Sequence, residues 1–112
     1  MIYIQLPDMN DSFSRLVLQG KEYLARFTYS YTDDSWTFGL YKGTREPIIT
    51  GIKLVPCFPV NRYFHTSDMP DGIFGVLTKL ERVGRKAFSS GDAKFVFIPS
   101  DELTEGAAEY NG

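Results

Sequence analysis

The chain has 112 residues, of which 43% are apolar and 15% aromatic, and this length and composition are those of one globular domain. The length argues against an enzyme with separate cofactor and substrate domains, and no apolar run approaches the roughly 18 residues of a membrane-spanning helix. Twelve basic and 14 acidic residues give a net charge of −2, which favours neither nucleic acid nor an anionic membrane as a partner. We therefore expect a soluble single-domain protein.

The first residues and the cysteine content narrow the class further. Residues 1–6 lack the basic lead and the long apolar run of a secretory signal, so we expect no export by that route. Cys57 is the only cysteine, which excludes an internal disulfide and a zinc cage built from several thiolates. We expect Cys57 to be a small buried or interfacial apolar residue, and we predict neither a metal nor a cofactor.

Alternating side chains predict two strands in the first third of the chain. Residues 13–18 (FSRLVL) and residues 21–31 (KEYLARFTYSY) flank Gln19 and Gly20, which supply the positive φ of a tight hairpin turn. In the second segment every other side chain should lie on one face of the sheet, because successive side chains of a strand point to opposite faces. This face carries Tyr23, Ala25, Phe27, Tyr29 and Tyr31.

Two further strands are predicted after the hairpin. A turn at residues 32–35 leads into residues 36–41 (WTFGLY), so the first three strands should form a meander. A second turn at residues 43–47 leads into residues 48–55 (IITGIKLV). This fourth segment carries apolar residues on both faces, which is typical of a sheet that is covered on both sides or curled on itself.

The stretch from Pro56 to Gly72 is longer than ordinary connections, and loops of this length are usually functional. Proline cannot donate to a central ladder, so Pro56 and Pro59 should end the strand and direct the chain outward. The loop either covers one end of its own core or contacts another protein, because Arg, Tyr and Phe are residue types enriched at interfaces. The interface residues predicted in this loop are Cys57, Phe58, Val60, Arg62, Tyr63 and Phe64.

A basic loop separates the last two predicted strands, at residues 72–80 and 94–98. Basic side chains outnumber acidic ones in and beside residues 81–92 (ERVGRKAFSSGD). We expect either a solvated loop or a contact with another subunit through complementary charge, and the interface residues predicted for that contact are Arg82, Arg85 and Lys86. The alternative is a small β-barrel that binds single-stranded nucleic acid or carbohydrate through exposed aromatic side chains, with the basic loop at the phosphates of a nucleic acid.

These elements predict an all-β architecture, a single small antiparallel β-sandwich or barrel of about seven short strands with one long loop rich in proline and aromatic residues. The β-domain should span residues 1–103, followed by an acidic tail at residues 104–112. Residues 101–108 form the only segment that could be helical, although Gly106 weakens it.

The chain lacks a convergent set of catalytic groups. His65 is the only histidine, so it has no second histidine with which to form a metal pair. The acid pairs Asp33-Asp34 and Asp101-Glu102 are of a kind that is usually solvated or caps backbone amides. The sequence therefore does not predict an enzyme.

Short motifs run through the chain in a definite order and spacing. They are Ile4-Gln5-Leu6-Pro7, Leu18-Gln19-Gly20-Lys21-Glu22-Tyr23, Trp36-Thr37-Phe38-Gly39-Leu40-Tyr41, Pro47-Ile48, Gly51-Ile52-Lys53-Leu54-Val55, Pro70-Asp71-Gly72-Ile73 and Phe97-Ile98-Pro99. Through them, residues 2–103 resemble the baseplate plug proteins of contractile-tailed bacteriophages, the family typified by a cyanophage baseplate plug. Each motif is common alone, so their order carries the resemblance. The turn at residues 32–35 and the acidic tail after Leu103 depart from the family pattern.

The resemblance implies a structural virion protein without catalytic residues, placed at the hub of a tail baseplate near the axis of the tail tube. It implies contacts with other baseplate hub and tail-tube proteins, with several symmetry-related copies in each virion. The protein would be made in the cytoplasm of the bacterial host. Neither nucleic acid nor a membrane is expected as a partner.

Overall fold

The structure, a computed structural model, describes residues 1–56 and 69–102. Strands make up most of these residues. They are β1 (Ile2–Ile4), β2 (Asp11–Leu18), β3 (Lys21–Ser30), β4 (Ser35–Lys42), β5 (Pro47–Leu54), β6 (Gly72–Thr78) and β7 (Ala93–Pro99). A helical turn begins at Ser100 and is described as far as Glu102, at the start of the segment predicted to be helical. The rest of that segment and the predicted acidic tail lie outside the described residues.

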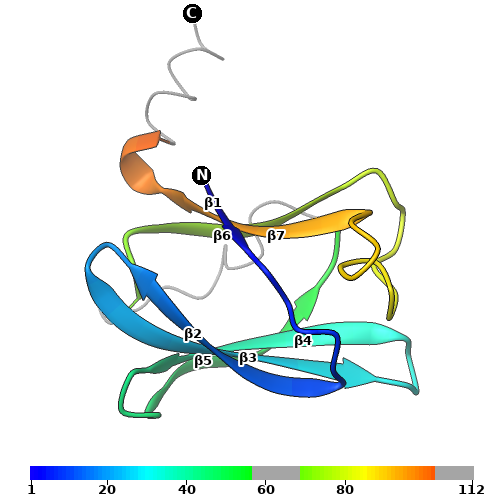
Figure 1. The fold of residues 1–112 in the computed structure, drawn as a ribbon, viewed down its shortest axis with the longest axis horizontal. Coiled ribbons are helices and arrows are strands. Elements are labelled where there is room, and N and C mark those ends of the chain that lie inside the picture. The colour runs from blue at the N-terminus through cyan, green and yellow to red at the C-terminus, as the bar shows by residue number, and fades with distance from the viewer. Residues whose placement is uncertain (57–68, 103–112) are drawn as a thin grey trace, which may run out of the picture.

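The strands form two antiparallel sheets, and they do not close into a barrel. The four-stranded sheet has the order β2-β3-β4-β5, and the three-stranded sheet has the order β1-β7-β6. Figure 1 shows the two sheets as separate layers, with the three-stranded sheet above the four-stranded one. The all-β prediction is confirmed, and of its two forms the sandwich is correct.

The hairpin of β2 and β3 forms as the sequence predicts. Gln19 and Gly20 have φ values of 54° and 78°. Two positive φ values are typical of the two-residue turn whose backbone twist matches that of the strands it connects. Tyr23, Ala25 and Phe27 are buried in the core, which confirms the alternation. Tyr31 departs from it, because β3 ends at Ser30 and the Tyr31 side chain is 76% exposed.

Strand β5 differs from the alternation that its sequence suggests. The pairing of β4 with β5 shifts register between Phe38 and Leu40, and Gly51 on β5 has a φ of 73°. A bulge of this kind adds a residue to one strand and restarts its alternation. Ile49 and Ile52, which an unbroken strand would place on opposite faces, are therefore both buried in the core. Because of the bulge, the apolar residues of β5 can reach a core that covers only one face of the sheet.

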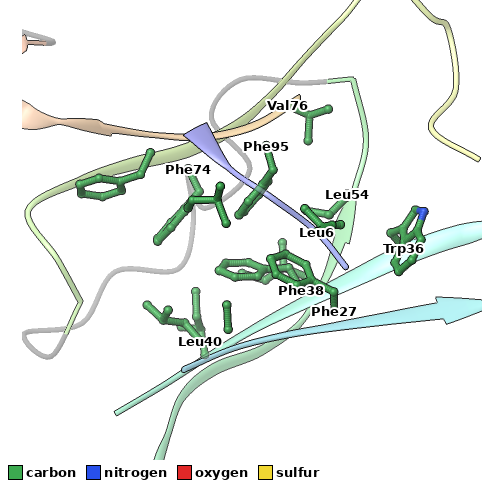
Figure 2. Packing of buried hydrophobic residues seen from close by; sticks show 14 of the residues in the cluster. Leu6, Phe27, Trp36, Phe38, Leu40, Leu54, Phe74, Val76 and Phe95 are labelled. Carbon is green, nitrogen blue, oxygen red and sulfur yellow. The ribbon is translucent and has the colours of Figure 1, made fainter. Parts of the chain in front are cut away.

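A cluster of phenylalanine rings joins the two sheets. Phe27 and Phe38 come from the four-stranded sheet, and Phe74 and Phe95 come from the three-stranded sheet (Figure 2). The centroid of the Phe38 ring lies 4.9 Å from that of Phe95 and 5.1 Å from that of Phe74. All four side chains are at most 1% exposed. Burial of these rings between the sheets therefore supplies much of the apolar area that stabilises the sandwich.

The first and last strands of the described chain are paired. Residues Ile2 to Ile4 of β1 align with Phe97 to Phe95 of β7. Strands β2 to β5 form a meander between them, and the chain then returns to the first sheet as β6 and β7. The three-stranded sheet is thus built from both ends of the chain.

Candidate functional site

The predicted interface residues divide into two sets. Cys57, Phe58, Val60, Arg62, Tyr63 and Phe64, together with His65, lie outside the described residues. The chain that follows them is fixed to the first hairpin, because the Gln19 side chain donates to the Asp71 carbonyl at 2.8 Å and accepts from the Asp71 amide at 2.7 Å. Arg82, Arg85 and Lys86 are described, and they lie in the loop between β6 and β7.

The loop of residues 79–92 closes one end of the sandwich with apolar side chains. Val83 and Ala87 are 2% and 6% exposed and belong to the core. The ring of Phe88 meets that of Trp36 edge-on, with their centroids 6.2 Å apart. The Trp36 indole also donates to the Gly84 carbonyl at 3.0 Å. The basic loop is therefore part of the folded body, and its apolar side chains pack against the core.

Arg85 is partly buried at this end. Its guanidinium carbon is 5.4 Å from the centroid of the Trp36 ring and 5.8 Å from that of Tyr29, within the range of cation–π attraction. The same group donates to Asn10 Oδ1 at 2.6 Å and to Asp8 Oδ1 at 2.7 Å. Arg85 thus joins the loop to β3, to β4 and to the chain that leads into β2.

The two neighbouring cations are more exposed. Arg82 forms an ion pair with Asp34, which also accepts a hydrogen bond from the Tyr29 hydroxyl. Lys86 lies 3.7 Å from Asp8. The side chains of Arg82 and Lys86 are 67% and 74% exposed, against 23% for Arg85. The structure therefore brings all three predicted cations to one end of the sandwich, where Arg82 and Lys86 are mostly exposed and Arg85 is partly buried.

Two acidic residues from distant parts of the chain, Asp8 and Asp34, offset most of the positive charge of the basic loop. The hydrogen bond from Arg85 and the charge of Lys86 hold the pKa of Asp8 below its usual value. The contribution of this carboxylate to stability is present above its unfolded pKa and is lost only as the pH falls through the lowered pKa. A surface whose cations are paired in this way offers less positive charge to phosphates, which argues against the nucleic-acid alternative.

We expect Arg85→Ala to lower the free energy of unfolding by about 1–2 kcal/mol, because it removes the contacts with the Trp36 and Tyr29 rings and the hydrogen bonds to Asp8 and Asn10. Lys86→Ala is the matched control. Its side chain is 74% exposed, so the change should stay within about 0.5 kcal/mol. Urea unfolding followed by fluorescence measures both values. Equal losses from the two variants would show that Arg85 does not anchor the loop.

Residues 1–56 and 69–102 contain neither a candidate metal site nor a candidate membrane-spanning helix. No group of three or more His, Cys, Asp or Glu side chains in this part of the chain could hold a metal ion. No helix there is long and apolar enough to cross a membrane.

A groove of about 550 Å³ runs along the end of the β6–β7 hairpin, lined by residues that include Leu77, Lys79, Leu80 and Lys94.

Comparison with known families identifies the chain. A search of curated proteins found no match. The model of one family, described as the cyanophage baseplate Pam3 plug gp18, matches residues 1–101. The match covers all seven strands of the described sandwich and both of its sheets. The resemblance seen in the sequence is therefore confirmed, and the chain belongs to the family of cyanophage baseplate plug proteins.

Proposed function

We propose that this protein is a structural subunit of the hub of a contractile phage tail baseplate and acts through protein contacts near the axis of the tail tube. The family match over residues 1–101 is the observation that carries the proposal. The fold supports it, because the described chain is one β-sandwich whose basic loop is used for packing and ion pairs. On this proposal the protein is not an enzyme, and its partners are other hub and tail-tube proteins.

The residues of the long loop are the proposed anchors of these contacts. Cys57, Phe58, Val60, Arg62, Tyr63 and Phe64 fall between Leu54, where β5 ends, and Asp71, which the Gln19 side chain holds. A segment whose two ends are attached to a rigid body loses less entropy when a partner binds it than a free chain does. The attached ends and the aromatic composition together support an interface here.

The basic-loop end supplies a second proposed contact. Arg82 and Lys86 expose most of their side chains, so they suit the polar rim of an interface. Arg85, which was also predicted to meet another subunit, lies mostly under the surface and would support that contact from below. Complementary charge on a partner would act mainly on the rate of association and on orientation.

Phe58→Ala and Tyr63→Ala test the proposed function in a phage that carries this gene. An aromatic anchor at the centre of an interface typically costs about 2 kcal/mol or more when truncated, so each variant should be depleted from purified baseplates. Immunoblots of virions measure incorporation, and thermal melts of the isolated protein measure folding. Tyr3→Ala, which changes a 62% exposed aromatic residue on β1, is the control.

Two results would count against these assignments in different ways. Variants that melt at lower temperature but assemble normally would show that the loop covers its own core, while the baseplate role would stand. A protein that is absent from purified virions and found only free in the host cytoplasm would remove the baseplate role itself.

A further inference from the structure

Strand β2 forms one edge of the four-stranded sheet, and no strand of the described chain pairs with its outer side. Leu18 and Lys21 flank the hairpin turn, so the hydrogen-bonded pairs with β3 fall on even-numbered residues of β2. The hydrogen bond of 2.7 Å from the Tyr29 amide to the Asn10 carbonyl follows the same alternation. The backbone groups of the odd-numbered residues Asp11 to Val17 therefore point toward the free edge.

This edge has only one of the features that usually prevent strand pairing, its charged side chains. Natural sheets protect their edges with very short strands, prolines, bulges or charged side chains, lysine above all. Strand β1 has three residues, and β5 begins at Pro47 and contains the bulge at Gly51. Strand β2 has eight residues, pairs with β3 without a register shift, and contains neither proline nor lysine. Its backbone can therefore accept another strand.

The odd-numbered side chains of β2 lie on the outer face of the sheet, next to the free backbone groups. Phe13 and Val17 are 54% and 68% exposed. The Phe13 ring meets Tyr41 edge-on at 5.5 Å, and the guanidinium carbon of Arg26 lies 5.5 Å from the Phe13 centroid. Exposed apolar side chains along an open strand are the usual composition of a surface that adds a strand.

Charged side chains alternate with these apolar ones. Arg15 pairs with Glu22 at 2.9 Å, and Asp11 pairs with Arg26 at 2.8 Å. Both β2 residues remain exposed, at 70% of the Arg15 side chain and 53% of the Asp11 side chain. Each can therefore meet a second group of opposite charge without leaving the first.

We propose that β2 pairs with β2 of a second copy of this chain, antiparallel and about a two-fold axis at Phe13. The two four-stranded sheets would then form one continuous sheet. In this register Phe13 faces Phe13 of the other copy, and Arg15 faces Asp11 in both directions. Val17 comes opposite Met9, a 56% exposed residue that precedes the strand. The Met9 amide already donates to the Pro7 carbonyl at 2.8 Å, so these two residues would meet through their side chains only. Apolar residues thus meet apolar residues, and each charge meets its opposite.

The neighbouring registers lack this match. Only shifts that keep odd residues opposite odd residues allow hydrogen bonding, because only those residues carry free backbone groups. One such shift places Asp11 opposite Val17, and the next places Arg15 opposite Arg15. Directly opposed like charges destabilise a strand pair. The charge pattern therefore selects the register centred on Phe13, and this self-complementary surface is what a two-fold dimer requires.

Sedimentation of the full-length protein tests the proposal, which concerns the isolated protein and does not depend on the baseplate role. Between about 10 µM and 1 mM it should pass from monomer to dimer, as expected of a weak interface. Arg15→Asp or Asp11→Arg alone places like charges opposite each other twice per dimer, so each should weaken dimerisation about tenfold. A mixture of the two variants should recover association as a heterodimer.

Amide hydrogen exchange tests which strand is involved. Protection of the Phe13 and Arg15 amides should rise with protein concentration, whereas the Ser14 and Leu16 amides, already bonded to β3, should stay protected throughout. Arg45→Asp, which makes the same charge change in the exposed turn between β4 and β5, should leave dimerisation unchanged. Thermal melts confirm that each variant is folded.

Three results would overturn the proposal. A protein that stays monomeric at 1 mM has no such interface. A dimer that resists both charge variants, or whose Phe13 and Arg15 amides exchange as fast at high concentration as at low, uses another surface.

Discussion

Phe38→Ala should lower the free energy of unfolding by about 3–5 kcal/mol, the usual range for removing a fully buried phenylalanine. The Phe38 side chain has no exposed surface, and its ring packs on Phe27 of its own sheet and on Phe74 and Phe95 of the other. Alanine would leave a cavity between the sheets, which close packing on both sides prevents from collapsing. This loss is a large share of the stability of a small domain.

Chemical unfolding of the purified protein measures the effect of this change. Phe13→Ala, compared at a dilute protein concentration, is a control with the same chemistry on the outer face, where Phe13 is 54% exposed. It should cost well under half as much, because less apolar surface leaves the protein interior. A loss below about 1 kcal/mol for Phe38→Ala would show that the ring cluster does not hold the sheets together.

Gly72→Ala should have the next largest effect, a loss of about 3 kcal/mol at the upper end of the range for overpacking. A Cβ added at Gly72 would overlap the Ile98 carbonyl oxygen and would lie 2.6 Å from Cζ of the Phe97 ring. The nearer atom belongs to the backbone of the paired strand β7, so relief requires the strands to separate. The first residue of β6 is therefore restricted to glycine.

Gly43→Ala is the matched control for this prediction. An added Cβ there would meet nothing closer than the Glu22 carbonyl oxygen at 3.4 Å, an ordinary contact distance. The melting temperature of Gly43→Ala should stay close to that of the original protein, whereas the melting temperature of Gly72→Ala should fall by roughly 10 °C or more. If the two alanine variants melt together, the β6–β7 pair accommodates the extra methyl group by a small shift.

The alternation of side chains accounts for most of the fold that could be predicted. Tyr23, Ala25 and Phe27 identify the buried face of β3, and Gln19-Gly20 identifies the hairpin, because both signals are local in sequence. The bulge in β5 was not predicted, since it depends on the register with β4 as well as on Gly51. Strand β1 was not predicted either, because its three residues are too few to show a period.

The candidate site was harder to predict because its contacts join distant residues. The sequence identifies Arg82, Arg85 and Lys86 as a charge cluster, yet their carboxylate partners Asp8 and Asp34 lie some 50 to 80 positions earlier. Charge counted along the chain therefore overestimated the charge of the folded surface. A signal for the packing of this loop was present in the spacing of its apolar residues, Val83, Ala87 and Phe88.

The pairing of β1 with β7 also affects how the chain folds during synthesis. The meander of β2 to β5 connects neighbours in sequence and can form as soon as it leaves the ribosome. Strand β1 is made first but must wait for β7, about 90 residues later, before its backbone groups are satisfied. Until then the apolar face of the meander has no opposing sheet to cover it. Newly made chains therefore pass through a stage at which aggregation competes with folding.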